Sequence, residues 1–229
     1  MARTYFSLGY LFNDQSKLVE AEQMYQRALQ GYEKAWGPEH TSTLDTVNNL
    51  AILYKTQGKL AEAEQMYQRA LQGYEKAQGP EHTSTLATVN NLALLYKNQG
   101  KLVEAEQMYE RALRGYETAI GADNITTFIP ALNTLWGLGS LFERQADYAK
   151  AMIMYSKTLA GYEKVVGPDH PRCQSLQEIL RDLDTRTKTE AIKGTKELAS
   201  NPSRVSGSDS KGALSTSRRY KLFRKLGLR

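Results

Sequence analysis

A 42-residue period governs most of this sequence. The string KLVEAEQMYQRALQGYEKAWGPEHTS at 17–42 returns at 59–84 with two changes, and again at 101–126 with more. Residues 43–84 and 85–126 are identical at 29 of 42 aligned positions, which is closer than packing alone demands and indicates recent duplication. A fourth copy, 127–172, is longer by four residues. A fixed period of this length predicts a repeat protein built from stacked supersecondary units.

Each unit has the apolar spacing of two helices separated by a turn. In the second unit Leu50 and Tyr54 follow three- and four-residue spacing up to Gly58, and the same spacing runs from Leu60 to Gly79. One pair cannot cover its own apolar faces, so neighbouring pairs must stack. We therefore predict an all-α solenoid of antiparallel helix pairs with units at 1–42, 43–84, 85–126 and 127–172.

Two local details follow from the same pattern. Thr41, Ser42 and Thr43 offer hydroxyls to cap the next first helix, with Asp45, three residues after Ser42, as the acidic partner of a capping box. The four extra residues of the fourth unit equal about one helical turn. We expect them to lengthen a helix of that unit, which would leave its apolar face nearly unrotated.

Charge and cysteine content limit the class of protein. Residues 1–184 carry 18 basic against 22 acidic side chains, whereas residues 185–229 carry 12 against 3. The only cysteine is Cys173, so neither an intramolecular disulfide nor a cysteine-rich zinc site is expected. No stretch has the roughly 18 apolar residues of a membrane span, and the N-terminal segment follows the repeat. We expect a cytoplasmic protein.

The residues of each unit resemble a tetratricopeptide repeat. Residues 49–71 follow that family's order of leucine, small residue, aromatic, glycine turn, alanine, aromatic and alanine, and residues 91–113 repeat the match. The longer second helix and the G-P-[DE]-H turn are similar to the kinesin light chain subtype. The same subtype also occurs in NOD-like signalling proteins of fungi and bacteria. The resemblance covers residues 1–172 and implies a right-handed superhelix.

The resemblance also implies that the first helix of each unit lines a concave groove. Amide side chains there would hydrogen-bond a peptide backbone, lysines would favour acidic peptide residues, and a tryptophan would anchor the peptide. The structural alternatives are solvated lysines, asparagines that bridge neighbouring helices, and a tryptophan in the core. The candidate peptide-binding residues are Asn48, Lys55, Asn90, Lys97, Asn133 and Trp136.

Other motifs that suggest chemistry have structural explanations. His40, His82 and His170 each close a G-P-[DE]-H turn, but equivalent residues of successive pairs lie roughly 16–20 Å apart, too far to share a metal ion. Neighbouring glutamates such as Glu62 and Glu64 point to different helix faces and do not form a catalytic pair. We therefore expect no catalysis, no cofactor and no metal.

The two ends carry separate expectations. Residues 173–193 have one apolar stripe and should form a capping helix. Residues 194–229 are basic and Ser-rich, and we expect a disordered tail that contacts acidic lipid, RNA or the chain's own groove. Met1 aligns with Thr43, so the first helix should lack a covering helix. Either that face pairs with another copy or the array continues.

These observations favour a non-catalytic scaffold that binds extended peptide segments of other proteins. Two alternatives stay open. One is the recognition part of a NOD-like receptor without its ATPase domain, since the GKL segments after Gln57 and Gln99 do not fit a phosphate-binding loop. The other is a kinesin light chain-like cargo adaptor, although the sequence shows no sustained heptads.

Overall fold

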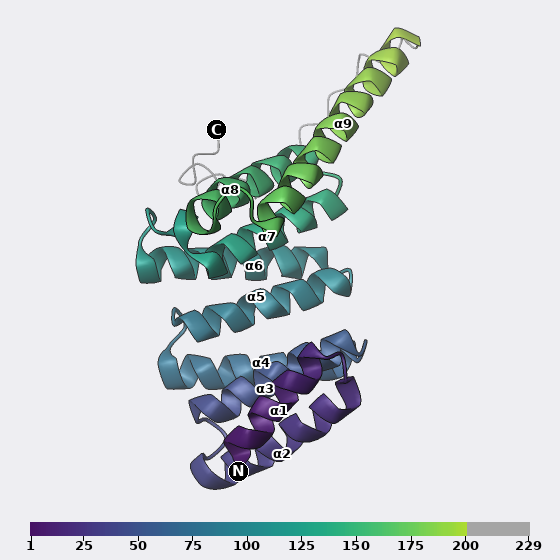
Figure 1. The fold of residues 1–229 in the computed structure, drawn as a ribbon. Coiled ribbons are helices and arrows are strands. Elements are labelled where there is room, and N and C mark those ends of the chain that lie inside the picture. The colour runs from purple at the N-terminus through teal and green to yellow at the C-terminus, as the bar shows by residue number, and fades with distance from the viewer. Residues whose placement is uncertain (201–229) are drawn as a thin grey trace, which may run out of the picture. The chain divides into compact units, whose positions relative to one another are not determined.

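The computed structural model describes the backbone of residues 1–200 and the side chains of residues 1–189. Residues 1–187 form one compact unit, in which the helix pairs stack one after another from α1 and α2 to α7 and α8 (Figure 1). This arrangement confirms the predicted all-α solenoid. The pairs are α1 (Ala2–Asp14) with α2 (Leu18–Trp36), α3 (Thr41–Thr56) with α4 (Leu60–Gln78), α5 (Thr83–Asn98) with α6 (Leu102–Ile120), and α7 (Ile129–Arg144) with α8 (Tyr148–Val166).

Small and aromatic residues alternate where the helices approach most closely. Ala63 and Ala70 of α4 are fully buried on either side of Tyr67, which is also fully buried. Each second helix contacts its own first helix and the first helix of the following unit. First helices also contact each other across units, α3 with α5 and α5 with α7. The side chains of α3, α5 and α7 therefore share one surface, which we call the first-helix face.

The turn inside each pair uses one residue in the left-handed backbone conformation. Gly58 and Gly100 have φ of 78° and 79°, and the equivalent Ser16 and Ala146 have φ of 59° and 58°. Glycine adopts this conformation without a steric penalty, whereas a residue with a Cβ atom is strained. The first and fourth units therefore hold the same turn at a cost that the two central units avoid.

Ion pairs between successive second helices reinforce the stack. Arg69 of α4 pairs with Glu33 of α2, and Arg111 of α6 pairs with Glu75 of α4. These four side chains are each about one-third exposed. Partly exposed pairs contribute modestly to stability, but their repetition indicates a fixed register between neighbouring units.

Two local predictions from the sequence are wrong. The N-cap of α3 is His40, whose Nδ1 accepts a hydrogen bond from the Ser42 amide at 3.2 Å. Asp45 instead accepts a hydrogen bond from the hydroxyl of Tyr74. An imidazole nitrogen thus replaces the expected hydroxyl because the helix begins at Thr41, so that Thr41, Ser42 and Thr43 all lie inside it.

The insertion in the fourth unit does not lengthen a helix. α7 has 16 residues, like α3 and α5, and α8 has 19, like α4 and α6. The extra residues lie between α6 and α7 and include the short 3-10 helix η1 (Ile125–Thr127). Ile125 is only 2 % exposed, so the insertion adds its own anchor to the core and leaves the helix register unchanged.

The last helix, α9 (Pro171–Ser200), takes the place of the next first helix. Its residues Cys173, Leu176 and Leu183 are fully buried. Thr187 on α9 contacts Met152 of α8 at 3.9 Å. Of the predicted tail, 194–229, residues 194–200 belong to α9, and residues 201–229 lie outside the described residues. Within the described part of the chain, no helix is both long and apolar enough to cross a membrane.

Candidate functional site

Two of the predicted peptide-binding asparagines, Asn48 and Asn90, lie half-buried on the first-helix face, whereas Asn133 is exposed. The Thr88 hydroxyl of α5 lies 3.5 Å from Asn48 Oδ1 of α3, so Asn48 spans two neighbouring first helices. Asn90 occupies the same position one unit later, and its buried Oδ1 has no hydrogen-bond partner among the described residues. The Asn48 carboxamide therefore faces the seam between units, and the N–H groups of both asparagines are the atoms that a peptide carbonyl would bind.

The predicted lysines form a basic cluster at the C-terminal ends of the first helices. Lys97 Nζ donates to Ser140 Oγ at 2.8 Å, and Arg144 donates to the backbone carbonyl of Lys97 at 2.8 Å. Lys55 is half-buried, and its ammonium has no hydrogen bond or ion pair with any described residue. The cluster therefore brings three positive groups from three successive units onto one surface.

The surroundings of these lysines disfavour their charged form. Burial lowers the pKa of Lys55 below its usual value. Burial also lowers the pKa of Lys97, and the nearby charges of Arg144 and Lys55 lower it further, while Glu143 opposes this effect. Glu143 is itself engaged, because Tyr155 donates to its Oε2 at 3.0 Å and Arg186 lies 4.0 Å from its Oε1. The cluster is left with an excess of positive charge.

Asn133 and Trp136 belong to a network at the other end of α7. Tyr162 of α8 donates to Asn133 Oδ1 at 2.6 Å, and Arg172 of α9 donates to the same oxygen at 3.2 Å. The Arg172 guanidinium also lies over the Tyr162 ring, 5.4 Å from its centroid. The half-buried Trp136 contacts Tyr162 edge-on at 6.2 Å. The Asn133 carbonyl is therefore occupied, and only its N–H donors are available to a ligand.

An acidic group stands opposite the basic cluster along the first helices. Asp45 is exposed near the N-terminal end of α3 and accepts the hydrogen bond of Tyr74. In α7 the equivalent position is Asn133, which Tyr162 contacts in the same manner. The first-helix face thus has a polar or acidic edge and a basic edge, a polarity that would orient a bound chain.

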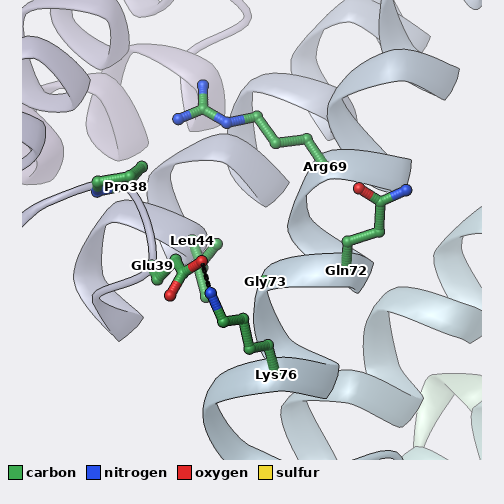
Figure 2. Close-up of a pocket in the computed structure, with 7 residues that line it drawn as sticks. All are labelled: Pro38, Glu39, Leu44, Arg69, Gln72, Gly73 and Lys76. Atoms are coloured by element: carbon green, nitrogen blue, oxygen red, sulfur yellow. Dashed lines mark hydrogen bonds and ion pairs between the residues drawn. The ribbon is translucent and has the colours of Figure 1, made fainter.

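A separate pocket of about 300 Å³ lies between the α2–α3 turn and α4. Figure 2 shows Lys76 directed at Glu39, and the two form an ion pair of 2.5 Å. The other cation in the pocket, Arg69, pairs with Glu33. Both charges are balanced locally, so this pocket offers less to a charged ligand than the basic cluster does.

The histidines that suggested a metal site act as helix caps. His82 Nδ1 accepts from the Ser84 amide, and His170 Nδ1 accepts from the Arg172 amide, each at 3.2 Å. His40 does the same for α3. No group of three potential metal ligands occurs among the described residues. The regular histidines are explained by the start of the helix that follows each one.

Sequence reasoning missed two parts of this site. The contact of Arg172 with Tyr162 and Asn133 joins residues of three helices. The predicted capping helix spans residues 173–193, and this prediction does not align Arg172 with Ser42, whose position in the repeat it occupies. The hydrogen bond between Lys97 and Ser140 also depends on the register across units. The sequence does contain a signal for Arg172, because residues 171–187 can be aligned with the first helices of the earlier units, and that alignment places Arg172 at the position of Ser42.

Comparison with known proteins agrees with the geometry. Tetratricopeptide repeat families match residues 1–76, 48–118 and 132–172. None of these families or the structures below is described as an enzyme. A search of curated protein sequences finds no match.

Solved structures share the fold. BtubC (BKLC) of P. vanneervenii superposes with a TM-score of 0.62 and 21% identity, covering 90% of this chain and 82% of that chain. A Podosopora anserina protein with kinesin light chain-like, nearly identical TPR-like repeats gives 0.65 and 19%, covering 88% and 96%. A variant of that fungal protein gives 0.66 and 20%, covering 86% and 92%. Because the family matches cover more than half of the sequence, the chain belongs to the tetratricopeptide repeat family.

Proposed function

We propose that this protein is a non-catalytic scaffold that binds extended, acidic peptide segments of partner proteins along the first-helix face. Tetratricopeptide repeats are protein interaction units. The observation that supports an acidic ligand is the unpartnered Lys55 ammonium beside Lys97 and Arg144. A carboxylate placed there would supply the counter-ion that the described residues do not.

The asparagines complete the proposed recognition. Asn48 and Asn90 occupy equivalent positions of successive first helices, and Asn133 lies three residues earlier in its helix, so all three can present N–H groups along the first-helix face. Backbone carbonyls of an extended chain can accept from them whatever the peptide sequence is, so the asparagines would give affinity. The basic cluster would give specificity, and Trp136 would supply apolar contact area beside Asn133. The single cysteine, Cys173, is a buried free thiol, which supports placement in the reducing cytoplasm.

A peptide array tests this proposal directly. We would probe random twelve-residue peptides with the full chain and expect aspartate and glutamate to be enriched among those bound. Lys55→Glu should weaken binding of the selected peptides at least tenfold, because it replaces attraction by repulsion at a half-buried position. Lys164→Glu is the matched control, since it makes the same charge change at an exposed position of α8.

The array result also defines failure. An array without acidic enrichment would contradict an acidic ligand. Equal binding by the Lys55 and Lys164 variants would contradict the first-helix face as the site. Unfolding curves of both variants must match that of the unmodified chain, because a loss of stability would explain weaker binding without any contact to the peptide.

A further inference from the structure

The first unit presents side chains that the second and third units use to dock onto their predecessors. In the second unit, Gln57 Nε2 and Lys59 Nζ both donate to Glu22 Oε2 at 3.0 Å. In the third unit, the equivalent Gln99 and Lys101 donate to Glu64 Oε2 at 3.0 and 3.1 Å. One glutamate therefore receives two donors from the following unit at two successive interfaces.

A second contact repeats beside the first one. Arg69 pairs with Glu33, and Arg111 pairs with Glu75. The receiving glutamates of one helix, such as Glu22 and Glu33, are eleven residues apart, about three turns. They therefore lie on the same face of the second helix. Each docking surface is a pair of glutamates that meets a glutamine, a lysine and an arginine.

The first unit carries the same donors without the acidic partners. Gln15, Lys17 and Arg27 are exposed, and none has a carboxylate partner among the described residues. Lys17 lies 5.8 Å from the centroid of the Phe12 ring within its own unit. Leu11 is 47 % exposed, whereas the equivalent Leu53 and Leu95 are fully buried against the preceding unit. We call Leu11, Gln15, Lys17 and Arg27 the N-terminal face.

We propose that the N-terminal face docks a further tetratricopeptide helix pair, one whose second helix carries glutamates at the positions of Glu22 and Glu33. Leu11 would enter the apolar interior of the new interface, Gln15 and Lys17 would bind the first glutamate, and Arg27 would bind the second. The occupant is defined by this acidic pair and not by apolar surface alone.

A second copy of this chain does not offer this chemistry, because its acidic pairs Glu22–Glu33 and Glu64–Glu75 already bind the unit that follows each of them. If the N-terminal faces of two copies met, Lys17 and Arg27 of one copy would lie close to the same positive side chains of the other copy and repel them. At the other end of the described array, α8 has Met152 at the position of Glu22, and α9 already packs there with its Thr187 at the position of Gln57. The expectation of self-association through the first unit is therefore not favoured by the charges.

The test supplies the missing helix pair on a tether. An isolated pair is unstable alone, so we would join a copy of residues 43–84 to Met1 of the full chain through a flexible glycine-serine linker. Such a linker gives an effective concentration in the millimolar range. We expect hydrogen exchange of the α1 amides around Leu11 to slow at least tenfold.

Charge reversal separates specific docking from general crowding. Glu75→Lys in the copy should abolish the slowing, and adding Arg27→Glu in the first unit should restore it. No slowing with the unmodified copy, or equal slowing with the reversed copy, would overturn the proposal. Slowing in the untethered chain that grows with protein concentration would also overturn it, because a second copy would then cover the face.

Discussion

The Cys173 thiol donates a hydrogen bond to the carbonyl oxygen of Gly167 at 3.3 Å. At the equivalent positions of the second and third units, Thr43 donates to the Gly37 carbonyl and Thr85 to the Gly79 carbonyl, each at 2.8 Å. This equivalence shows that α9 begins as a first helix begins. It also predicts that Cys173 acts as a weak substitute for threonine.

Cys173→Thr should raise the free energy of unfolding by about 0.5–1 kcal/mol, because a hydroxyl is a stronger donor than a thiol. Cys173→Val has the threonine shape without the donor and should lower it by about 1 kcal/mol. Urea unfolding of the full chain measures both. Equal stability of the two variants would show that a hydrogen bond from this position to the Gly167 carbonyl contributes nothing.

The two turns with a residue other than glycine in the left-handed conformation predict two stabilising changes. Ala146→Gly should stabilise the chain by about 0.5–1 kcal/mol. The left-handed conformation costs an L-residue about 1–2 kcal/mol, and part of the gain from removing this strain is offset because glycine loses more backbone entropy on folding. Ser16→Gly should act likewise. Gly100→Ala is the reverse control and should destabilise. A loss of stability in Ala146→Gly, seen by thermal unfolding, would mean that its Cβ makes contacts worth more than the strain.

The histidine caps can be tested at α5. His82→Ala should cost about 1 kcal/mol of stability and speed hydrogen exchange at the Ser84 amide, because that amide loses its acceptor. His82→Asn keeps an acceptor at the N-cap and should retain most of the stability. Equal effects of alanine and asparagine would assign the role of His82 to packing instead of capping.

The repeat period was sufficient to predict the fold because it fixes both the helix pairs and their neighbours. Tyr67 with Ala63 and Ala70, for example, can be placed in the core from spacing alone. The same reasoning failed at the N-cap, where propensity favoured the hydroxyls of Thr41, Ser42 and Thr43, and the turn geometry placed His40 there instead. The sequence reasoning also failed at the insertion in the fourth unit. Four extra residues can form one more helical turn, or they can lengthen a loop that buries an apolar side chain of its own, and their number does not distinguish the two.

The candidate site was harder to predict because its contacts cross units. Register placed Asn48, Lys55, Asn90 and Lys97 on first helices, but it could not show that Thr88 approaches Asn48 or that Ser140 receives Lys97. Those contacts depend on the rotation between successive pairs, which side-chain volumes set. The side chain of Asn133 was assigned to a ligand, whereas its carbonyl already receives Tyr162 and Arg172.

The lowered pKa of Lys97 predicts how peptide binding depends on pH. Only the protonated amine attracts a carboxylate, so affinity for an acidic peptide should be constant near neutral pH and fall as pH rises through the lowered pKa of Lys97. The decline should begin below the usual lysine range near 10.4. Calorimetric titration at several pH values measures it. Lys97→Arg should shift the decline upward, since arginine stays charged, and an unshifted decline would assign it to another group.

Lys55 should show opposite effects on stability and on binding. Burial lowers its pKa, so the folded state holds the proton less tightly than the unfolded state does, and stability should rise with pH across the interval between the two pKa values. Below that interval the protonated amine lowers the stability by a constant amount.

Lys55→Met removes the charge and keeps the apolar stem, so it should stabilise the free protein by about 0.5–1 kcal/mol. The same variant should bind acidic peptides about tenfold more weakly. Thermal unfolding without peptide and fluorescence titration with it measure the two effects, and Lys164→Met should change neither. A variant that loses both stability and affinity would show that Lys55 supports the fold and not a ligand.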